Sequence, residues 1–523
     1  MQQSANEPKS IGTMIVTYFR DFGVLRQTRS EYWGTQIVNF LDCTIFFAIL
    51  TISPIILSEN FGFTDAQAGY VVTIFGSTTT ICLLFSGMFM DWLGIRWSLY
   101  LAMPVLTILR AAIAVLALNP DLLPDHRGTL VTLAYFLMAP CMALVQTVFQ
   151  AANKRFTTQK SRSAGFNLWY LFMNVGAALA GVLIDVIYLV LRLPRVHIFS
   201  LGAVFAVLCF VVTLVVIRRE EQLYGPDEAP DPRSKGLRKN PFEIVSAVMR
   251  EPVFWRFVCL VSLLLGVRAV FLYMHLLWPK YWLRVIGPDA LIGTLNTINP
   301  ILVIVGLILL IPILHRFSVY KMLVYGSIIS ALSLFVMAIP SWGNTTYTVS
   351  IIAIVVLSIG ELLWSPRLTE YTAAIAPVGQ EGTYLGLSMV PYFFAKTAVS
   401  FFSGHMLAIW VPELPDGELL RDRLAAGEVP FYLTPSTLWL LLGVFALAGP
   451  LVALALKGWF TKGAKWTTDA SATDHPVPVP AAEPPATTVP AAGAVLDAGG
   501  TCPSCGTDRI PGTPCPGCGR PPE

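Results

Sequence analysis

The sequence predicts an all-α membrane protein with twelve transmembrane helices in two bundles of six. The 523-residue chain is 55% hydrophobic and only 13% charged, whereas soluble domains carry about 25% charged residues. The apolar residues gather in runs of about 20, the length that a helix needs to cross a bilayer. A polar connector separates the first six runs from the last six, which favours two bundles that rock about a central site.

Each apolar run is predicted to be a helix and not a strand of a membrane barrel. Only helices and closed barrels satisfy all backbone polar groups in lipid. Barrel strands have about 9–11 alternating residues, and these runs are longer and more uniformly apolar. The runs cover residues 32–57, 66–89, 97–118, 128–150, 164–191, 196–217, 253–279, 290–314, 319–340, 346–375, 382–410 and 434–457.

Changes in composition divide the chain into six parts. The connector is rich in Pro and charge, and the tether is rich in Ala, Pro, Thr and Val without a helical period, which is typical of disorder. The predicted parts are an N-terminal cytoplasmic segment (1–31), a first bundle (32–217), a cytoplasmic connector (218–252), a second bundle (253–457), a disordered tether (458–500) and a zinc-ribbon-like module (501–523).

The distribution of Lys and Arg predicts the orientation. Basic loop segments lie at Lys154–Arg162, Arg218–Arg219 and Arg233–Lys239. If the N-terminus is cytoplasmic, the cytoplasmic segments hold far more Lys and Arg than the opposite loops, as the positive-inside rule requires. The first thirty residues lack the features of a cleavable signal peptide. We therefore expect an integral protein of the plasma (inner) membrane with both termini in the cytoplasm.

Motifs for chemistry at phosphate or acyl groups are missing from the sequence. It has no phosphate-binding loop, so ATP drive is not expected, and no Gly-x-Ser-x-Gly nucleophile motif. Its six His residues are spread out, so we do not expect an enzyme. The basic residues lie close to the membrane, so we do not expect a nucleic-acid partner. A channel or a receptor with twelve spans remains the alternative to a transporter.

The C-terminal module carries four of the nine cysteines. Two Cys-x-x-Cys pairs, each followed by Gly, would form two tight turns that present four thiolates to one ion: Cys502, Cys505, Cys515 and Cys518. Four thiolates predict a closed, structural Zn²⁺ site without a catalytic position. Disulfides or free thiols are the alternative, and disulfides are disfavoured in the cytoplasm. Such a module suits docking to a cytosolic protein partner.

The turn between the second and third runs contains a recognisable motif, GMFMDWLGIRW. Its residues Gly87, Asp91, Gly94 and Arg96 resemble the cytoplasmic loop motif of the major facilitator superfamily, with Trp92 in place of the motif's first Arg. Glycine permits close helix approach and a tight turn, and Asp91 would pair with a cation or cap a neighbouring helix when a gate is closed. A plain polar turn is the alternative.

Three further stretches resemble the fifth, eighth and tenth spans of the proton-coupled oligopeptide transporter family within that superfamily. They are RSAGFNLWYLFMNVGAALAG (Arg162–Gly181), NTINPILVIVGLILLIP (Asn296–Pro312) and GELLWSPRLTEYTAAIAP (Gly360–Pro377). With FTDAQAG before the second span, the resemblance covers about residues 32–457. It implies the major facilitator fold and secondary active transport by alternating access.

The resemblance also implies site residues. Glu361 matches the family's tenth-span glutamate, which would contact the amino end of a bound peptide. Asn174 and Asn299 match polar positions that line the same cavity. An ion pair between helices is the alternative for Glu361, and helix packing is the alternative for the two asparagines.

The first span departs from the family. Where the family has Glu-x-x-Glu-Arg, the sequence NFLDCTIFF places Asn39 and Asp42 at the glutamates and Cys43 at the arginine. In the family this arginine takes part in holding the peptide carboxylate. A peptide-like substrate therefore lacks its expected anchor here.

Other charges within the runs would compensate. A cation at the centre of a bilayer costs about 3 kcal/mol by insertion scales, so it is expected to face a cavity or a partner. Arg268 and Lys396 would bind an anionic group, and Asp42 and Glu361 would exchange protons. The alternative is that Lys396 pairs with Glu361, and Arg268 with Asp42.

These features predict a secondary active transporter of a small organic solute, coupled to protons. Its partners would be the solute, protons and the lipid bilayer. The alternative function is a non-transporting ligand sensor, a transceptor that signals through the zinc module. The changed first span and the added module favour the sensor, whereas the loop motif and the polar residues within the spans favour the transporter.

Overall fold

The computed structural model describes residues 22–219, 221, 223, 250, 252–314, 318–375 and 381–461. The chain divides into two units, Met1–Asp474 and His475–Glu523, and all described residues belong to the first. The tether beyond residue 461, the four cysteines of the C-terminal module and most of the connector lie outside the described residues. The predictions made for them stay predictions.

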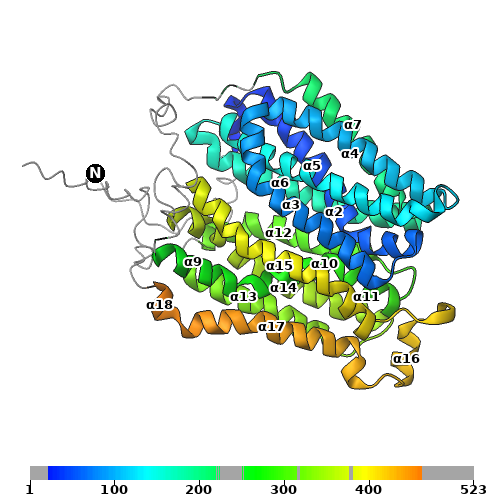
Figure 1. The fold of residues 1–523 in the computed structure, drawn as a ribbon. Coiled ribbons are helices and arrows are strands. Elements are labelled where there is room, and N and C mark those ends of the chain that lie inside the picture. The colour runs from blue at the N-terminus through cyan, green and yellow to red at the C-terminus, as the bar shows by residue number, and fades with distance from the viewer. Residues whose placement is uncertain are drawn as a thin grey trace, which may run out of the picture. The chain divides into compact units, whose positions relative to one another are not determined.

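Six long helices form an N-terminal bundle (Figure 1). They alternate in direction because short turns join them. They are α2 (Ser30–Phe61), α3 (Asp65–Leu93), α4 (Ile95–Leu118), α5 (Arg127–Arg155), α6 (Gln159–Asp185) and α7 (His197–Val215). Short helical segments flank them: η1 (Phe22–Gln27), η2 (Pro124–His126) and η3 (Val186–Val190).

The remaining described helices form a C-terminal bundle, drawn in green to orange in Figure 1. Its long helices are α12 (Ile292–Leu314), α13 (Val319–Met337), α14 (Asn344–Ile375), α15 (Glu381–Trp410) and α17 (Pro435–Ala455). Its shorter segments are α9 (Pro252–Leu263), α10 (Leu265–Leu276), α11 (Trp278–Val285), η5 (Pro415–Gly417), α16 (Leu420–Ala426), η6 (Phe431–Leu433) and α18 (Lys457–Thr461).

Ten of the described helices are long and apolar enough to cross a membrane. Two predicted runs are not among these ten. The run 253–279 is divided between α9 and α10, of twelve residues each, and the first residues of α11. The run 382–410 coincides with the 30-residue helix α15, of which side chains are described only from Phe394 onward. The all-helical membrane fold is confirmed, and the count of twelve spans stays a prediction.

A capping residue sets the start of α3, and a glycine sets its end. Thr64 caps α3, because its side chain accepts a hydrogen bond from the backbone of Gln67 while the Gln67 side chain accepts one from the backbone of Thr64. Gly94, between α3 and α4, adopts a φ of 84°. A residue with a side chain rarely adopts this conformation, so the tight turn expected at Gly94 is confirmed.

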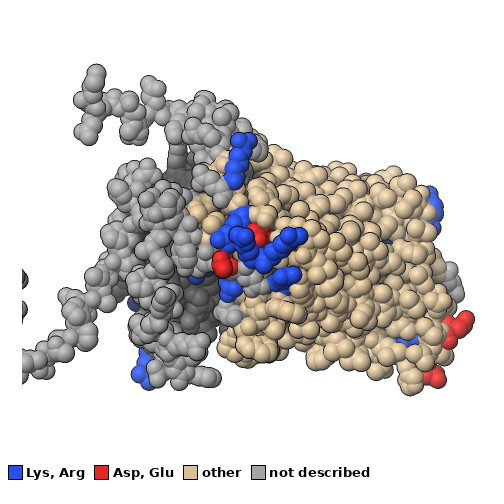
Figure 2. All heavy atoms as spheres, turned by 90° about the horizontal axis from the view of Figure 1, so that it is seen from above, with Lys and Arg blue, Asp and Glu red and all other residues tan. Residues whose placement is uncertain are grey.

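The loops that join the helices lie at two opposite ends of the bundles, which we call the Asp65 end and the Gly94 end. The Asp65 end comprises residues 62–64, 119–126, 191–196, 286–291, 338–343 and 411–434, and the Gly94 end comprises residues 94, 156–158, 216–219 and 318. Figure 2 shows Lys and Arg gathered toward one side of the visible face, next to a wide surface without charge. Such a surface is suited to lipid, because every charged group there would have to leave water.

The two bundles contact each other mainly along two helix pairs, α3 with α15 and α6 with α12. Small residues permit both approaches. A Cβ atom added at Gly69 of α3 would lie 3.2 Å from the Ser400 carbonyl oxygen of α15, and Gly181 of α6 lies against Gly293 of α12. Small residues are the usual means of close helix packing in membranes.

Candidate transport site

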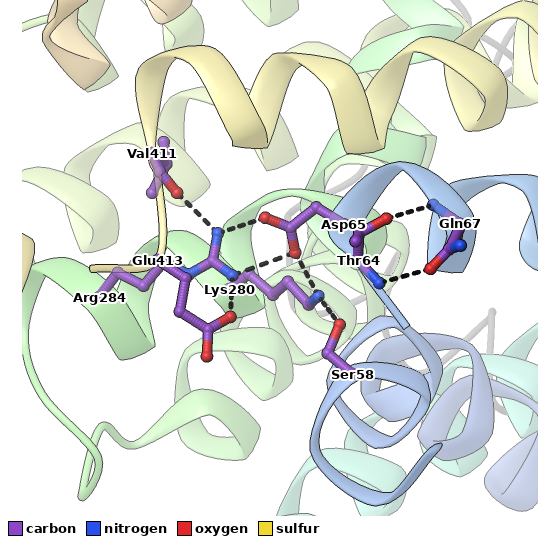
Figure 3. A network of polar contacts seen from close by, with 8 residues as sticks. All are labelled: Ser58, Thr64, Asp65, Gln67, Lys280, Arg284, Val411 and Glu413. Carbon is purple, nitrogen blue, oxygen red and sulfur yellow. Dashed lines mark hydrogen bonds and ion pairs between the residues drawn. The ribbon is translucent and has the colours of Figure 1, made fainter. Parts of the chain in front are cut away.

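A network of charges, buried except for Glu413, joins the two bundles at the Asp65 end (Figure 3). The Asp65 carboxylate accepts hydrogen bonds from Lys280 Nζ at 2.5 Å and from both Arg284 terminal nitrogens at 2.7 and 3.0 Å. Lys280 also donates to Ser58 Oγ at 2.6 Å. Arg284 also donates to the Val411 carbonyl oxygen at 2.6 Å and to the carboxylate of Glu413 at 2.9 Å. We call these residues the Asp65 network.

Local structure positions each member of the network. Asp65 is the first residue of α3, directly after the Thr64 cap, so its carboxylate lies at the edge of the N-terminal bundle. Lys280 and Arg284 are four residues apart on α11 and therefore share one face. The side chains of Asp65 and Lys280 are only 8% and 4% exposed. Breaking such a pair leaves a buried charge without compensation, so separating the two bundles at this end carries an energetic cost.

Two more sets of polar contacts join the bundles at the same end. The Asp185 carboxylate, at the end of α6, accepts hydrogen bonds from the backbone of Gly293 at 2.8 Å and of Thr294 at 2.6 Å. It thus caps the start of α12, a helix of the other bundle, where a negative charge is favourable. Arg195 pairs with Glu59 at 3.1 Å and donates to the Pro288 carbonyl oxygen at 3.2 Å.

The approach of α6 to α12 leaves no room for a side chain. A Cβ atom added at Gly181 would lie 2.2 Å from the Gly293 carbonyl oxygen and 2.2 Å from Thr297 Oγ1. We therefore expect Gly181→Ala to separate the helices and lower the melting temperature of the purified protein, at a cost of about 1–3 kcal/mol. Gly458→Ala is the control, because no described residue lies within 4 Å of a Cβ atom added there. Equal melting of the two variants would contradict the packing.

Deeper along the bundles, Glu361 of α14 lies in a polar cluster. Asn299 Nδ2 of α12 donates to Glu361 Oε2 at 2.9 Å and to Ser358 Oγ at 3.0 Å. Tyr170, on α6 of the N-terminal bundle, lies within electrostatic range of Glu361 and packs against an apolar cluster of α12 and α14. Asn174, one turn after Tyr170, donates to the Tyr170 carbonyl oxygen at 2.9 Å. The structure thus brings Asn299 and Glu361 together and places Asn174 close by, across the boundary between the bundles.

Lys396 lies where α15 crosses α3. Its side chain extends over Gly76, since a Cβ atom added there would lie 3.1 Å from Lys396 Cε and 3.8 Å from Nζ. The next residues of the two helices, Ser77 and Thr397, share a hydrogen bond of 2.8 Å between their hydroxyl groups. Within the described part of the chain Lys396 forms no ion pair with Glu361, so that alternative is not observed.

Asp42 is placed differently from Glu361. Its carboxylate pairs with Arg110 of α4 at 3.2 Å, and both side chains are buried, at 3% and 1% exposed. Arg110 also donates to the Gly202 carbonyl oxygen of α7 at 3.2 Å. Asp42 therefore lies inside the N-terminal bundle, and the cation beside it is Arg110 and not Arg268 as the alternative supposed.

The Asp42–Arg110 pair predicts unequal effects of single and double substitution. Arg110→Met leaves a buried carboxylate without a cation and should cost about 3–5 kcal/mol, whereas Asp42→Leu combined with Arg110→Met removes both charges and should be close to neutral. Thermal melting of the purified variants checks this. The pair would not be a structural one if the double variant melted as early as Arg110→Met.

Two polar residues of α10, Arg268 and His275, contact other helices. The Arg268 guanidinium lies 5.7 Å from the centre of the Trp364 ring of α14, within the same bundle. His275 Nδ1 lies 3.0 Å from Thr51 Oγ1 of α2, which links the two bundles. Arg268 therefore lies over an aromatic ring of α14. The hydrogen bond between α2 and α10 is made by His275.

The loop motif at the Gly94 end is only partly described. Among the described residues, nothing lies within 4 Å of a Cβ atom added at Gly87, and the close helix approach expected there stays a prediction. The approach of α3 to α15 occurs at Gly69, far from Gly87 along α3. Arg96 Nε donates to the hydroxyl of Tyr100 on its own helix. The side chain of Asp91 lies outside the described residues, so its expected role stays a prediction.

Sequence reasoning missed Lys280 and Arg284 and gave Asp65 no role. A usable signal was present. Two cations four residues apart follow directly after an apolar run, and an acid follows directly after Thr64, the first residue of a Thr-x-x-Gln capping pattern. The described residues contain no group of three or more His, Cys, Asp and Glu able to hold a metal. The five cysteines predicted to be isolated within the spans are free in this structure.

Comparison with solved structures shows the fold. The chain resembles the nucleoside transporter NupG (TM-score 0.61, 13% identity, covering 82% of this chain and 99% of that one). It also resembles a D-xylose–proton symporter (TM-score 0.63, 14% identity, covering 84% and 98%). A third similar structure is a peptide transporter POT in complex with alafosfalin (TM-score 0.58, 16% identity, covering 82% and 94%). No curated protein matches the chain by sequence.

A family profile gives the assignment. Residues 35–399 match the profile described as Major Facilitator Superfamily, which is more than half of the chain. The match begins within α2 and extends into α15, so it includes the loop motif, the Asp65 network residues of α3 and α11, and the cluster around Glu361. The chain belongs to the Major Facilitator Superfamily.

Proposed function

We propose that this protein is a proton-coupled secondary active transporter of a small organic solute, working by alternating access. Membership of a transporter superfamily supports this class. The similar structures include a D-xylose–proton symporter and a peptide transporter, which suits a small solute moved with protons. Among the described residues, the hydrogen bonds that join the bundles through Thr51, Ser77 and Asp65 lie in the half of each helix nearer the Asp65 end, whereas Tyr170 packs against the other bundle nearer the Gly94 end. A carrier held together mainly at the Asp65 end would have this pattern.

The observation that carries the proposal is the position of Glu361. Its carboxylate is bound by Asn299 of its own bundle and lies within range of Tyr170 from the other bundle. An ionisable group within a membrane helix is expected to serve an ion or substrate pathway. In the proposed cycle Glu361 takes up a proton when the site faces the side of higher proton concentration. Rearrangement of the bundles changes its neighbours and releases the proton on the other side.

The Asp65 network is proposed as the gate on the non-cytoplasmic side. The positive-inside pattern supports a cytoplasmic location for the Gly94 end and both termini, in an inner or plasma membrane. Exposed Lys154, Arg218 and Arg219 near the Gly94 end support this orientation. In the conformation described, the gate is closed, and opening it requires that Asp65 leave Lys280 and Arg284.

The narrower family position is also a proposal. The stretches around Asn174, Asn299 and Glu361 support a relationship to oligopeptide transporters, and two of these residues share a hydrogen bond. The first-span changes at Asp42 and Cys43 argue against an unmodified peptide substrate. Asp42 pairs with Arg110 inside one bundle, so proton exchange is proposed at Glu361.

Uptake into proteoliposomes tests the proposal. Purified protein is reconstituted, a pH gradient is imposed, and a panel of labelled amino acids, peptides, sugars and nucleosides is offered. At least one solute should accumulate above its outside concentration with the gradient, and only equilibrate after an uncoupler is added. A protein that binds a solute but never accumulates it would be a sensor, and the proposal would fail.

The C-terminal module is proposed to bind one structural Zn²⁺ through Cys502, Cys505, Cys515 and Cys518, and to dock a cytosolic protein. Elemental analysis of the full-length protein should give about one zinc per chain, because four thiolates complete a tetrahedral site. Cys505→Ser combined with Cys515→Ser should reduce the zinc to background, while Cys82→Ser, within a membrane helix, should not. Equal zinc in all three proteins would refute the site.

A further inference from the structure

Lys396 lies between the bundles and forms no ion pair with a carboxylate of the described residues. Its aliphatic chain extends over the backbone of α3 at Gly76, and this position permits no side chain without displacing the lysine. The side chain is partly buried, and the described part of the chain offers its ammonium group no hydrogen bond or ion pair. The buried lysine of the Asp65 network has the opposite arrangement, with a carboxylate at 2.5 Å.

A cation in this position requires a physical reason. Charged residues within membrane helices are costly and are expected to face a partner or a water-filled pathway. The described side chains beside Lys396 supply polarity but no negative charge. Ser77 and Thr397 hydrogen-bond to each other across the same interface. The acid that might have paired with Lys396, Glu361, is bound by Asn299. Among the described residues no carboxylate supplies this negative charge, which points to a bound anion.

We propose that the ammonium group of Lys396 binds the carboxylate of the transported solute, so that the substrate class is organic monocarboxylates. This inference rests on the proposed transport function and adds the substrate class to it. One ammonium group neutralises one negative charge. A phosphate dianion would favour several cations or the forked guanidinium of an arginine. Since one hydroxyl of the Ser77–Thr397 pair donates to the other, the remaining hydroxyl proton would add one neutral donor beside the charge.

The position of Lys396 also explains how binding would couple to movement. Lys396 belongs to α15 of the C-terminal bundle and lies against Gly76 of α3 in the N-terminal bundle. An anion held there would contact both bundles. A ligand changes a conformational equilibrium only through a difference in affinity between the states, and a site on the moving interface supplies that difference.

Matched acids and amides test the inference. Binding to the purified full-length protein is measured by thermal shift and calorimetry for lactate and lactamide, nicotinate and nicotinamide, L-leucine and L-leucinamide, and L-alanyl-L-alanine and its amide. At least one acid should bind about ten-fold or more tightly than its amide, because a charge-assisted hydrogen bond contributes about 1.5–3 kcal/mol. Lys396→Gln should remove this preference, and Lys396→Arg should keep part of it. Lys321→Gln, at an exposed lysine of α13, is the control.

The ratio of acid to amide affinity within one variant does not depend on how much of that variant is folded. The inference is overturned if no acid in the panel is preferred to its amide, or if Lys396→Gln keeps the preference. If a neutral amide accumulates under a pH gradient, the transport function stands and the inference fails. If Lys396-dependent acid binding occurs without accumulation of any member, the site stands and the transport function fails.

Discussion

Glu361→Gln is expected to abolish proton-driven accumulation while leaving the protein folded. The amide keeps the size of the carboxylic acid and can still accept the hydrogen bond from Asn299, which is 2.9 Å long in the parent. It cannot exchange a proton. With one proton per solute, a gradient of one pH unit supports up to about ten-fold accumulation, since 1.4 kcal/mol corresponds to a factor of ten. The variant should reach equal concentrations inside and outside, a loss of that whole factor.

Two measurements separate this effect from damage to the fold. Exchange of labelled for unlabelled solute needs no proton gradient and should continue in Glu361→Gln. Glu428→Gln, at an exposed glutamate between α16 and η6, should accumulate solute like the parent. If Glu361→Gln concentrates solute as well as the parent does, the proton does not bind at Glu361.

Asp65→Asn is expected to open the Asp65 end. The substitution leaves Lys280 and Arg284, which are 4% and 11% exposed, without their shared carboxylate. Removing one partner of a buried charge pair costs about 3–5 kcal/mol. That cost falls on the closed conformation, where the charges are buried. A shift of this size changes the ratio of two conformations by more than a hundred-fold, enough to convert a closed gate into a mainly open one.

Spin labels at Asp121 and Ala426 report this change. Both positions are exposed at the Asp65 end, one in each bundle. Asp65→Asn should add a population at longer distance, while Asp65→Glu, which keeps the charge, should add little. Asp422→Asn, at an exposed carboxylate that pairs with Arg421, is the matched control. An unchanged distance distribution in Asp65→Asn would show that the network does not hold the gate.

The fold was largely predictable because lipid imposes a simple rule on sequence. Ten predicted runs coincide with helices long and apolar enough to cross a membrane, and the turn at Gly94 has the backbone conformation that only glycine adopts readily. The division of the run 253–279 was not predictable at Leu264, which has no neighbouring proline. A Cβ atom added at Gly266 would lie 3.0 Å from Ala446 Cα of α17, and such a close tertiary approach is not visible in a linear pattern. The break before Trp278 has a local cause in Pro279.

The candidate site was predictable only where a motif specified it. The stretch around Glu361 and the one around Asn299 each matched a family span, and the structure joins these residues by a hydrogen bond. The partner of Asp42 was not predictable, because the sequence does not show which face of α2 meets which helix. Arg110 binds it from α4. The Asp65 network was missed since its members lie at the margins of apolar runs, where charged residues are ordinary.

The most direct test of the account is solute-dependent proton movement. Proteoliposomes containing a trapped pH-sensitive dye are given a transported solute outside, with no initial pH gradient. For the parent protein, addition of solute should acidify the interior, because each solute enters with a proton taken up at Glu361. The same addition should give no acidification with Glu361→Gln, although labelled solute still exchanges. Solute entry without acidification in the parent, or equal acidification in both proteins, would contradict the proposed coupling.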